Sequence, residues 1–380
     1  MITNPFFLSA NIPPEYFCDR EKETEKLTNY LLNGNNVTLI SPRRMGKSGL
    51  INHCFRQKKI KDNFSTLYID ILQTTSLREF VFLFGKAVYE KIVPKTKKWI
   101  SSFFQTLKSL HGKITFDPFS GLPSFNMFIG EITNPEFTLD EIFDFLNRYD
   151  KKCIIAIDEF QQISHYTEKN VEAILRSHIQ QQNNAYFIFS GSERHIMNEM
   201  FLTANRPFYH SSSIMILEAI PKDIYTDFAS HLFKRFGKKI ESDAIDFLYN
   251  LFNGYTYYLQ KTLNEVFSRI DKMAVCDVEK IKESIYEILE DNSTKYREIL
   301  SNIPDRQKEL LYAIAIEREV EKITSGEFIK KYNLFSTSSV QSAMRVLLEK
   351  DYITHLDSKY FLTDKFLSLW IKQIYGSGDI

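Results

Sequence analysis

Cysteine is scarce in this sequence, and its placement argues against a disulfide framework or a zinc site. Four cysteines occur in 380 residues, and no two of them form a Cys-x-x-Cys pair. No histidine stands at the spacing of a zinc ligand from them. Reduced thiols of this kind are usual inside the cell, so we predict a cytoplasmic protein. The cysteines are Cys18, Cys54, Cys153 and Cys276.

Long apolar runs are also missing. No stretch approaches the roughly 18 consecutive apolar residues that a membrane-spanning helix requires. The segment from Met1 to Ala10 lacks the basic start and the apolar run of an export signal. We therefore expect neither a membrane span nor export.

The chain has no excess of charge, because 48 lysine and arginine residues balance 48 aspartate and glutamate residues. A protein that binds the phosphates of DNA usually carries a basic excess, at least locally. The charge of the whole chain gives no support for that function. Aromatic residues are plentiful, and the 32 phenylalanine and 20 tyrosine residues predict Phe-rich cores. The length predicts two or three domains.

Short β-prone runs alternate with stretches of helical period up to about residue 220. The run at 153–157 is apolar throughout, as expected for a strand buried on both faces. Strands that alternate with helices predict a parallel sheet covered by helices, which is an α/β fold. A helix before the first strand is predicted, with Asp19 as its N-cap. The β-prone runs are 37–40, 67–71, 153–157, 186–190 and 213–217, and a hairpin insertion is predicted at about 99–137.

A phosphate-binding loop follows the first predicted strand. Residues Ser41 to Ser48 keep the Gly-Lys-Ser end of the P-loop pattern, with Ser41 in place of its first glycine. In such a loop the lysine, Lys47, pairs with the β- and γ-phosphates and Ser48 binds Mg²⁺. A chance Gly-Lys-Ser is the alternative, which the strand before and the helix after argue against. The predicted nucleotide contacts are Pro42, Arg43, Arg44, Met45, Gly46, Lys47, Ser48 and Gly49.

The third predicted strand ends in two acids, Asp158 and Glu159, in the manner of a Walker B motif. Asp158 is the candidate Mg²⁺ ligand, and Glu159 is the candidate general base that orients the attacking water. Two solvated acids at a strand end would be the alternative. The P-loop upstream favours the catalytic interpretation.

Several further polar residues have two interpretations each. Ser190 and Ser192 follow the next strand, where a hydroxyl can sense the γ-phosphate, but Ser192 can equally cap the following helix. Arg43 and Arg44 can reach phosphate or face a neighbouring domain. Arg206 can act as an arginine finger supplied in trans by an oligomer, or it can form a surface ion pair.

The sequence becomes helical after Pro221. Residues 222–300 predict a small helical bundle. Helices at about 305–318, 324–332 and 337–350 precede short strands at 352–355 and 359–362, which is the outline of a winged helix. The predicted domains are a core at 1–220, a helical lid at 221–303 and a winged-helix domain at 304–380.

The winged-helix segment is electrically neutral. Residues 305–370 contain ten basic and ten acidic side chains. Its third helix offers Ser338, Ser339, Gln341 and Ser342 to a nucleic acid, with only Arg345 and Lys350 as basic groups. A duplex-binding helix usually carries a basic stripe, so neutrality favours a role in protein contact or packing.

These motifs together resemble the archaeal-type AAA+ ATPases of the STAND class, especially bacterial paralogues like those of Bacteroidetes. The motifs that carry the resemblance are Phe17–Glu21, Ser41–Ser48, Ile157–Gln161, Gly191–Ser192 with His195 and Met197, Arg206–Tyr209, and Asp364–Phe366 with Trp370. The resemblance implies an AAA+ core, a helical lid and a C-terminal winged helix. It also implies ATP and Mg²⁺ at the two acids and the P-loop, and it puts Asp19 and Arg20 near the adenine.

The chain departs from that family pattern at two positions. Ser41 replaces the first loop glycine, and Thr256 stands where the lid often carries a proline that touches the nucleotide. Serine adopts many turn geometries, so we expect nucleotide binding to persist. The lid contact is the more affected of the two.

Two functions follow from these observations. The first is an ATP-driven molecular switch, in which the bound γ-phosphate changes the position of the lid and the winged helix and hydrolysis resets it. The second is a DNA-associated ATPase that binds duplex through the winged helix. Glu159 argues against a pseudoenzyme that only binds nucleotide. A protein partner is expected, and its identity stays open.

Overall fold

The computed structural model describes residues 4–110, 115–116, 123–124 and 132–376. These residues form two compact units. The core unit comprises Ser9–Glu218, and the C-terminal unit comprises Ala219–Ile380 together with the first residues, Met1–Leu8.

A parallel five-stranded sheet lies at the centre of the core unit, in the order β2-β5-β6-β1-β7. This confirms the predicted α/β fold, and all five β-prone runs are strands. The strands are β1 (Val37–Ile40), β2 (Ser65–Asp70), β5 (Cys153–Asp158), β6 (Ala185–Gly191) and β7 (Ser213–Ile216). The register pairs Asp70 with Asp158 and Ile40 with Gly191, so the carboxyl ends of four strands meet at the same end of the sheet.

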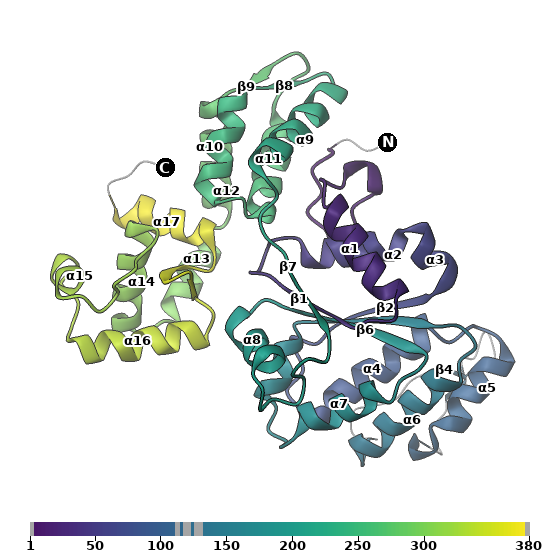
Figure 1. The fold of residues 1–380 in the computed structure, drawn as a ribbon. Helices are drawn as coiled ribbons and strands as arrows, with labels where there is room; N and C mark the ends of the chain where they lie inside the picture. Colours follow the sequence, from purple (N-terminus) through teal and green to yellow (C-terminus); the bar gives the residue numbers. More distant parts are fainter. Residues whose placement is uncertain (1–3, 111–114, 117–122, 125–131, 377–380) are drawn as a thin grey trace. The chain divides into compact units, whose positions relative to one another are not determined.

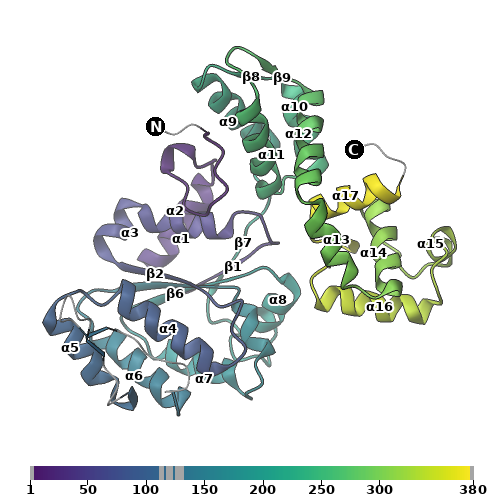
Figure 2. The same ribbon diagram turned by 180° about the vertical axis from the view of Figure 1, so that it is seen from behind.

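Helices cover both faces of this sheet (Figures 1 and 2). All six residues of β5 are buried. Ile154 and Ala156 pack on the face covered by α1 and α2, whereas Ile155 and Ile157 pack on the face covered by α4, α6 and α7. The helices of the core unit are α1 (Glu21–Leu32), α2 (Lys47–Arg56), α3 (Lys58–Asn63), α4 (Leu77–Lys91), α5 (Lys97–Thr106), α6 (Pro135–Arg148), α7 (Val171–Gln180) and α8 (Arg194–Leu202).

The start of α1 differs from the prediction. Asp19 does not cap the helix, because the N-cap position is occupied by Arg20 and no side chain there accepts a helix N–H. Asp19 and Arg20 both have positive φ angles, of 42° and 67°, and this left-handed turn leads the chain into α1. The preference of aspartate for the N-cap position does not predict two consecutive residues with a left-handed backbone.

The segment between α5 and α6 contains the antiparallel pair β3 (Thr115–Phe116) and β4 (Pro123–Ser124), within the predicted hairpin insertion. The intervening residues 117–122 and the predicted β-prone residues 125–128 lie outside the described part of the chain.

A phenylalanine cluster supports the segment that follows β5, as the composition predicts. Phe160 is fully buried and begins the 3₁₀ helix η4 (Phe160–His165). Its ring contacts Phe189 of β6 at 4.6 Å between centroids and Phe208 at 5.2 Å. This packing fixes the backbone that directly follows Glu159 in the sequence.

The C-terminal unit is helical, with two short strand pairs. Its winged-helix part has helices α14, α15 and α16 followed by the antiparallel strands β10 and β11, close to the predicted outline. Ser325, Ser336 and Asp364 cap α15, α16 and α17 by accepting first-turn N–H groups. The elements are α9 (Lys222–Arg235), β8 (Lys239–Ile240), α10 (Ser242–Phe252), α11 (Thr256–Arg269), β9 (Val275–Cys276), α12 (Val278–Asp291), α13 (Ser293–Ser301), α14 (Asp305–Glu317), α15 (Gly326–Lys331), α16 (Thr337–Glu349), β10 (Ile353–Leu356), β11 (Lys359–Leu362) and α17 (Lys365–Tyr375).

The N-terminal residues pack on this second unit. Phe6 is fully buried against Phe233 and Phe267, with ring centroids 5.5 and 5.7 Å away. The Asn4 amide donates to the Asn264 carbonyl at 2.8 Å, and the Asn264 amide donates to the Phe6 carbonyl at 2.7 Å. The first residues therefore close the face of α9 and α11.

Tyr258 joins the helical bundle to the winged helix. Its hydroxyl donates to the Thr363 carbonyl at 3.1 Å and accepts the N–H of Lys365 at 3.0 Å, so it connects α11 to the start of α17. Its ring is fully buried and lies 5.0 Å from Phe366. The Lys365 ammonium lies 4.5 Å from the ring centre of Tyr255, and burial lowers the pKa of Lys365 to about 8. These contacts make the bundle and the winged helix one packed body.

No helix in the described ranges is long and apolar enough to cross a membrane.

Removal of the Tyr258 hydroxyl tests this connection. Tyr258→Phe leaves the ring in place but removes the hydrogen-bond partner of a carbonyl and an N–H that are partly buried, at a cost of about 1 kcal/mol. We expect a lower thermal unfolding midpoint and faster hydrogen exchange at the start of α17. Tyr257→Phe, the exposed neighbour, is the control. Identical midpoints for the two variants would contradict the assigned role of the hydroxyl.

Candidate active site

The P-loop connects the end of β1 to the start of α2. Gly46 occupies the N-cap of α2 with a φ of 93°, a left-handed conformation that glycine adopts without a Cβ penalty. Ser41 is fully buried and is not among the residues of positive φ. Its N–H donates to the Gly191 carbonyl at 3.3 Å. Serine at this position therefore costs no backbone strain, which explains how the loop tolerates it.

Lys47 points back into its own loop. The residue is 6% exposed, and its ammonium donates to the carbonyls of Ser41 at 2.9 Å and Pro42 at 3.3 Å. Burial lowers the pKa of Lys47, whereas the nearby carboxylates of Glu159 and Asp158 act in the opposite direction. A buried ammonium that donates hydrogen bonds to neutral carbonyls is suited to pair with an anion.

Asp158 gathers donors from three neighbouring elements. The residue is 4% exposed, and its carboxylate accepts hydrogen bonds from the Ser48 hydroxyl of α2 at 2.8 Å and from the Ser190 hydroxyl of β6 at 2.5 Å. The Tyr68 hydroxyl of β2 and the N–H of Glu159 also donate to it, the latter at 3.0 Å. The structure thus brings Ser48 and Asp158 together, although they stand 110 positions apart in sequence.

Glu159 has a left-handed backbone, with a φ of 55°, and its carboxylate has two donors. The Ser192 hydroxyl and the Gln161 amide both donate to its Oε2 atom at 2.6 Å. Arg43 of the P-loop in turn donates from Nε to Ser192 at 3.2 Å. Ser192 is not a helix cap, because the N-cap of α8 is Glu193. A chain of contacts therefore runs from the P-loop through Ser192 to Glu159.

The segment before α1 lies against the P-loop and α2. Arg20 is buried, pairs with Glu23 at 2.7 Å and donates to the Met45 carbonyl at 3.4 Å. Phe17 stacks on His53 of α2 with ring centroids 4.1 Å apart. Asp19 precedes Arg20 in the left-handed turn. A side chain at Gly49 would contact Phe17, with its Cβ 3.6 Å from the ring.

Arg206 forms ion pairs within the core unit. It pairs with Glu172 of α7, and with Glu199 of α8 at 3.3 Å. Burial raises the pKa of Glu172, and the Arg206 guanidinium opposes that shift. These contacts correspond to the ion-pair interpretation that the sequence left open beside the arginine finger.

Comparison with known proteins identifies the chain's family. Residues 17–262 match the model of the ATPase domain predominantly from Archaea. The chain belongs to this family. Residues 294–373 of this ATPase-family protein also match a probable winged helix domain. A search of curated proteins found no match.

Solved structures share the fold of this ATPase-family protein along nearly its whole length. A Walker-type ATPase of Pyrococcus abyssi is 17% identical, with a TM-score of 0.65, and the match covers 97% of this chain and 99% of that one. The Aeropyrum pernix ORC2 protein, solved in ADPNP and ADP complexes, is 12% identical with a TM-score of 0.58 and covers of 97% and 96%. The Aeropyrum pernix ORC1 protein, solved with DNA, is also 12% identical, with a TM-score of 0.54 and the same covers.

The residues of the ATPase domain fit a Mg²⁺ ion. The Ser48 hydroxyl at the start of α2 and the Asp158 carboxylate at the end of β5 place two oxygen atoms 2.8 Å apart. Mg²⁺ prefers oxygen ligands and usually takes one or two from the protein, with the remainder from phosphates and water. The Ser48 hydroxyl would ligate the ion here, and Asp158 would hold its coordination shell through water.

The sequence patterns did not predict a role for two residues of this site, Tyr68 and Gln161. Tyr68 lies inside a predicted strand, where a tyrosine is ordinary, and only its place near the carboxyl end of that strand was a signal. Gln161 is fully buried beside Glu159, and it appears in the motif Ile157–Gln161 without an assigned role. Both roles depend on which strands and loops are neighbours in space.

Proposed function

We propose that this protein binds and hydrolyses ATP with Mg²⁺ and works as a molecular switch of the STAND type. The observation that carries the proposal is the convergence of Lys47, Ser48, Asp158 and Glu159 at one end of the sheet. The family match to an ATPase domain supports the same reaction.

The chain's own groups account for binding and for proton transfer. The N–H groups at the start of α2 and the Lys47 ammonium receive the phosphates, and Lys47 exchanges its carbonyl partners for phosphate oxygens. Mg²⁺ on Ser48 and Asp158 supplies positive charge to the phosphate oxygens when bound. Glu159 orients the attacking water and takes its proton, while ADP leaves and phosphate forms.

Ser192 and Arg43 have a role in controlling Glu159 in this proposal. Ser192 and Gln161 both donate to the Glu159 Oε2 atom, so a change in these partners would change the orientation of the carboxylate toward the attacking water. An arriving phosphate attracts the Arg43 guanidinium away from Ser192. We also propose that Asp19 and Arg20 lie near the base of the nucleotide and that Arg206 acts in trans after it leaves its ion pairs.

The switch acts through the C-terminal unit. Tyr258 and Phe366 tie α11 to α17, so a movement that nucleotide causes in the helical bundle would carry the winged helix with it. Nucleotide can change the populations of two such conformations only to the extent that it binds one of them more tightly than the other. We propose that this activity takes place in the cytoplasm. We also propose a protein partner that binds in a way that depends on the position of the winged helix.

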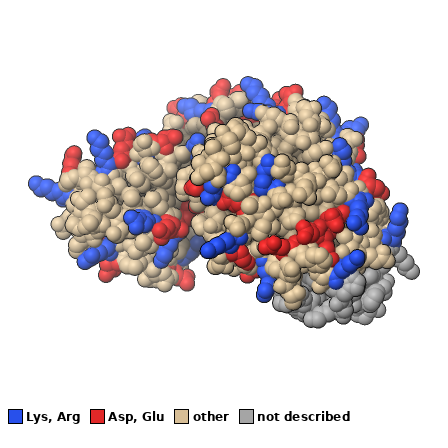
Figure 3. All heavy atoms as spheres, turned by 60° about the horizontal axis from the view of Figure 1, so that its bottom comes forward, with Lys and Arg blue, Asp and Glu red and all other residues tan. Residues whose placement is uncertain are grey.

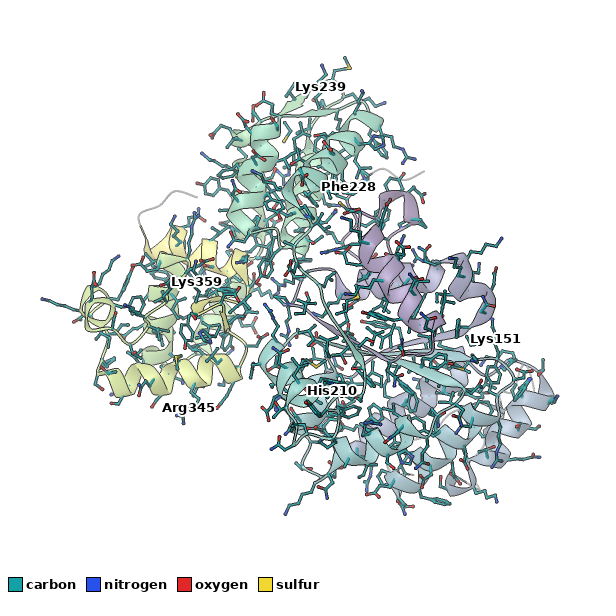
Figure 4. All side chains as sticks on the ribbon, in the orientation of Figure 1. Lys151, His210, Phe228, Lys239, Arg345 and Lys359 are labelled. Carbon is teal, nitrogen blue, oxygen red and sulfur yellow. The ribbon has the colours of Figure 1, made fainter. Side chains whose placement is uncertain are left out.

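DNA association is the second candidate function, and the winged helix domain at 294–373 favours it. The ORC1 protein with the same fold was solved with DNA. In the C-terminal unit, α16 exposes Ser338, Gln341, Ser342 and Arg345 to solvent, and Figure 4 shows Arg345 directed away from the helices behind it. On the face drawn in Figure 3, basic and acidic side chains are interspersed, in keeping with the neutral count.

Two substitutions test hydrolysis. We expect Lys47→Ala to abolish ATP binding, since it removes the buried ammonium that pairs with phosphate. Glu159→Gln should retain binding and lose turnover by about 10²–10⁴-fold, the usual contribution of a general base. Binding is measured by equilibrium titration, and turnover by phosphate release. Wild-type turnover in Glu159→Gln would show that the base is elsewhere.

Nucleotide-dependent hydrogen exchange tests the switch. In Glu159→Gln, ATP should change protection in α11 and in α17 together, because Tyr258 joins them, whereas ADP should not. Tyr258→Phe in the same background should weaken the response of α17 alone. Changes confined to the core unit would be inconsistent with a switch that includes the winged helix.

Salt-dependent duplex binding tests the DNA alternative. If α16 contacts phosphates, Arg345→Ala with Lys350→Ala should weaken binding to all sequences and reduce the salt slope by about 2, or about 1 per lost contact. Lys239→Ala with Lys272→Ala, both exposed in the helical bundle, is the charge-matched control. Absence of duplex binding by the wild-type protein at low salt would reject this function.

A further inference from the structure

Tyr68 contributes a hydroxyl to the Asp158 site from a strand that carries neither the P-loop nor the Walker B acids. It lies in β2, the edge strand of the sheet, beside β5. Its ring packs with Tyr186 and Phe55 against the apolar cluster under α1 and α2. Phenylalanine would satisfy that packing equally well, so the hydroxyl requires a separate explanation.

The hydroxyl donates to the same carboxylate oxygen that Ser48 uses. Both Tyr68 and Ser48 donate to the Asp158 Oδ2 atom, while Ser190 and the Glu159 N–H donate to Oδ1. Each oxygen therefore has two donors, and the carboxylate plane cannot rotate without breaking several hydrogen bonds. Tyr68 and Ser190 approach from the strands on the two sides of β5.

The Tyr68 phenol keeps its proton at neutral pH and remains a donor. Burial raises the pKa of Tyr68, and the negative charge of Asp158 raises it further. A serine hydroxyl that ligates a cation through a lone pair can still donate its proton to a carboxylate. The arrangement of Tyr68, Asp158 and Ser48 is therefore compatible with a cation bound at Ser48.

We propose that Tyr68 is a positioning residue of the divalent-cation site, which orients the Asp158 carboxylate toward Ser48. This inference rests on the proposed Mg²⁺-dependent ATPase function and assigns a third strand to the site. Partners that hydrogen-bond to a metal-binding carboxylate fix its orientation, and their loss typically lowers metal affinity about 10–100-fold.

Tyr68→Phe tests the proposal, with Tyr186→Phe as the matched control. Tyr186 packs in the same cluster, but its hydroxyl accepts the Lys152 ammonium at 3.0 Å. Binding of a fluorescent ADP analogue to the full-length chain is titrated with Mg²⁺, and in parallel with excess chelator. Mn²⁺ binding in the presence of ADP, followed by electron paramagnetic resonance, gives a second readout that does not depend on turnover. Thermal unfolding without nucleotide shows whether each variant is folded.

We expect Tyr68→Phe to raise the Mg²⁺ and Mn²⁺ concentrations for half-maximal effect by about tenfold or more, with binding in chelator unchanged. Tyr186→Phe should match the wild type in both series. The proposal is overturned if the two variants give the same cation dependence, or if Tyr68→Phe weakens binding equally with and without cation. If the affinity of the wild-type protein for the ADP analogue were the same with and without Mg²⁺, the proposed function would be overturned, and this inference with it.

Discussion

The arrangement of this site depends on a carboxylate buried at the end of a strand. Transfer of a lone carboxylate from water into a protein interior is very unfavourable unless hydrogen bonds or a counter-charge replace its hydration. Asp158 meets this requirement with hydroxyl groups from α2, β2 and β6 and with the following N–H. Those donors are available only when three strands and the P-loop helix keep their register. The burial of one charge therefore links the sheet topology to the geometry of the phosphate loop.

The same site holds a buried cation that has neutral partners. Lys47 lies against two carbonyls of its own loop, and burial disfavours its charge. An anion that enters the loop gives this ammonium a better partner, so the energy of nucleotide binding comes partly from a charge that the fold has already desolvated. Glu159 is likewise held by polar side chains near the loop. Without nucleotide, Lys47 and Glu159 are therefore already buried or held near the loop that would bind the phosphates.

Within the C-terminal unit, the helical bundle and the winged helix are joined by direct contacts. The family match to the ATPase domain ends at residue 262, within α11, so it includes the first part of the helical bundle and not α12 or α13. The remainder of the unit is tied to that helix by Tyr258, whose hydroxyl serves two backbone groups of the α17 start. A buried hydroxyl with both partners satisfied resists separation, because either unpaired group would be costly. The bundle and the winged helix are for this reason expected to respond together.

Local pattern in the sequence was enough to predict much of this protein. Strand runs, the P-loop and the acids after the third strand are recognisable because apolar period, glycine placement and spacing act over a few residues. Ser48 and Asp158 were both predicted to bind the same Mg²⁺ ion, from the P-loop and Walker B patterns. Only the tertiary structure decided that Ser192 holds Glu159 rather than capping α8, that Arg206 pairs with Glu172, and that Tyr68 reaches Asp158. These outcomes depend on strand order and on left-handed backbone turns, which are set by packing between residues far apart in the chain.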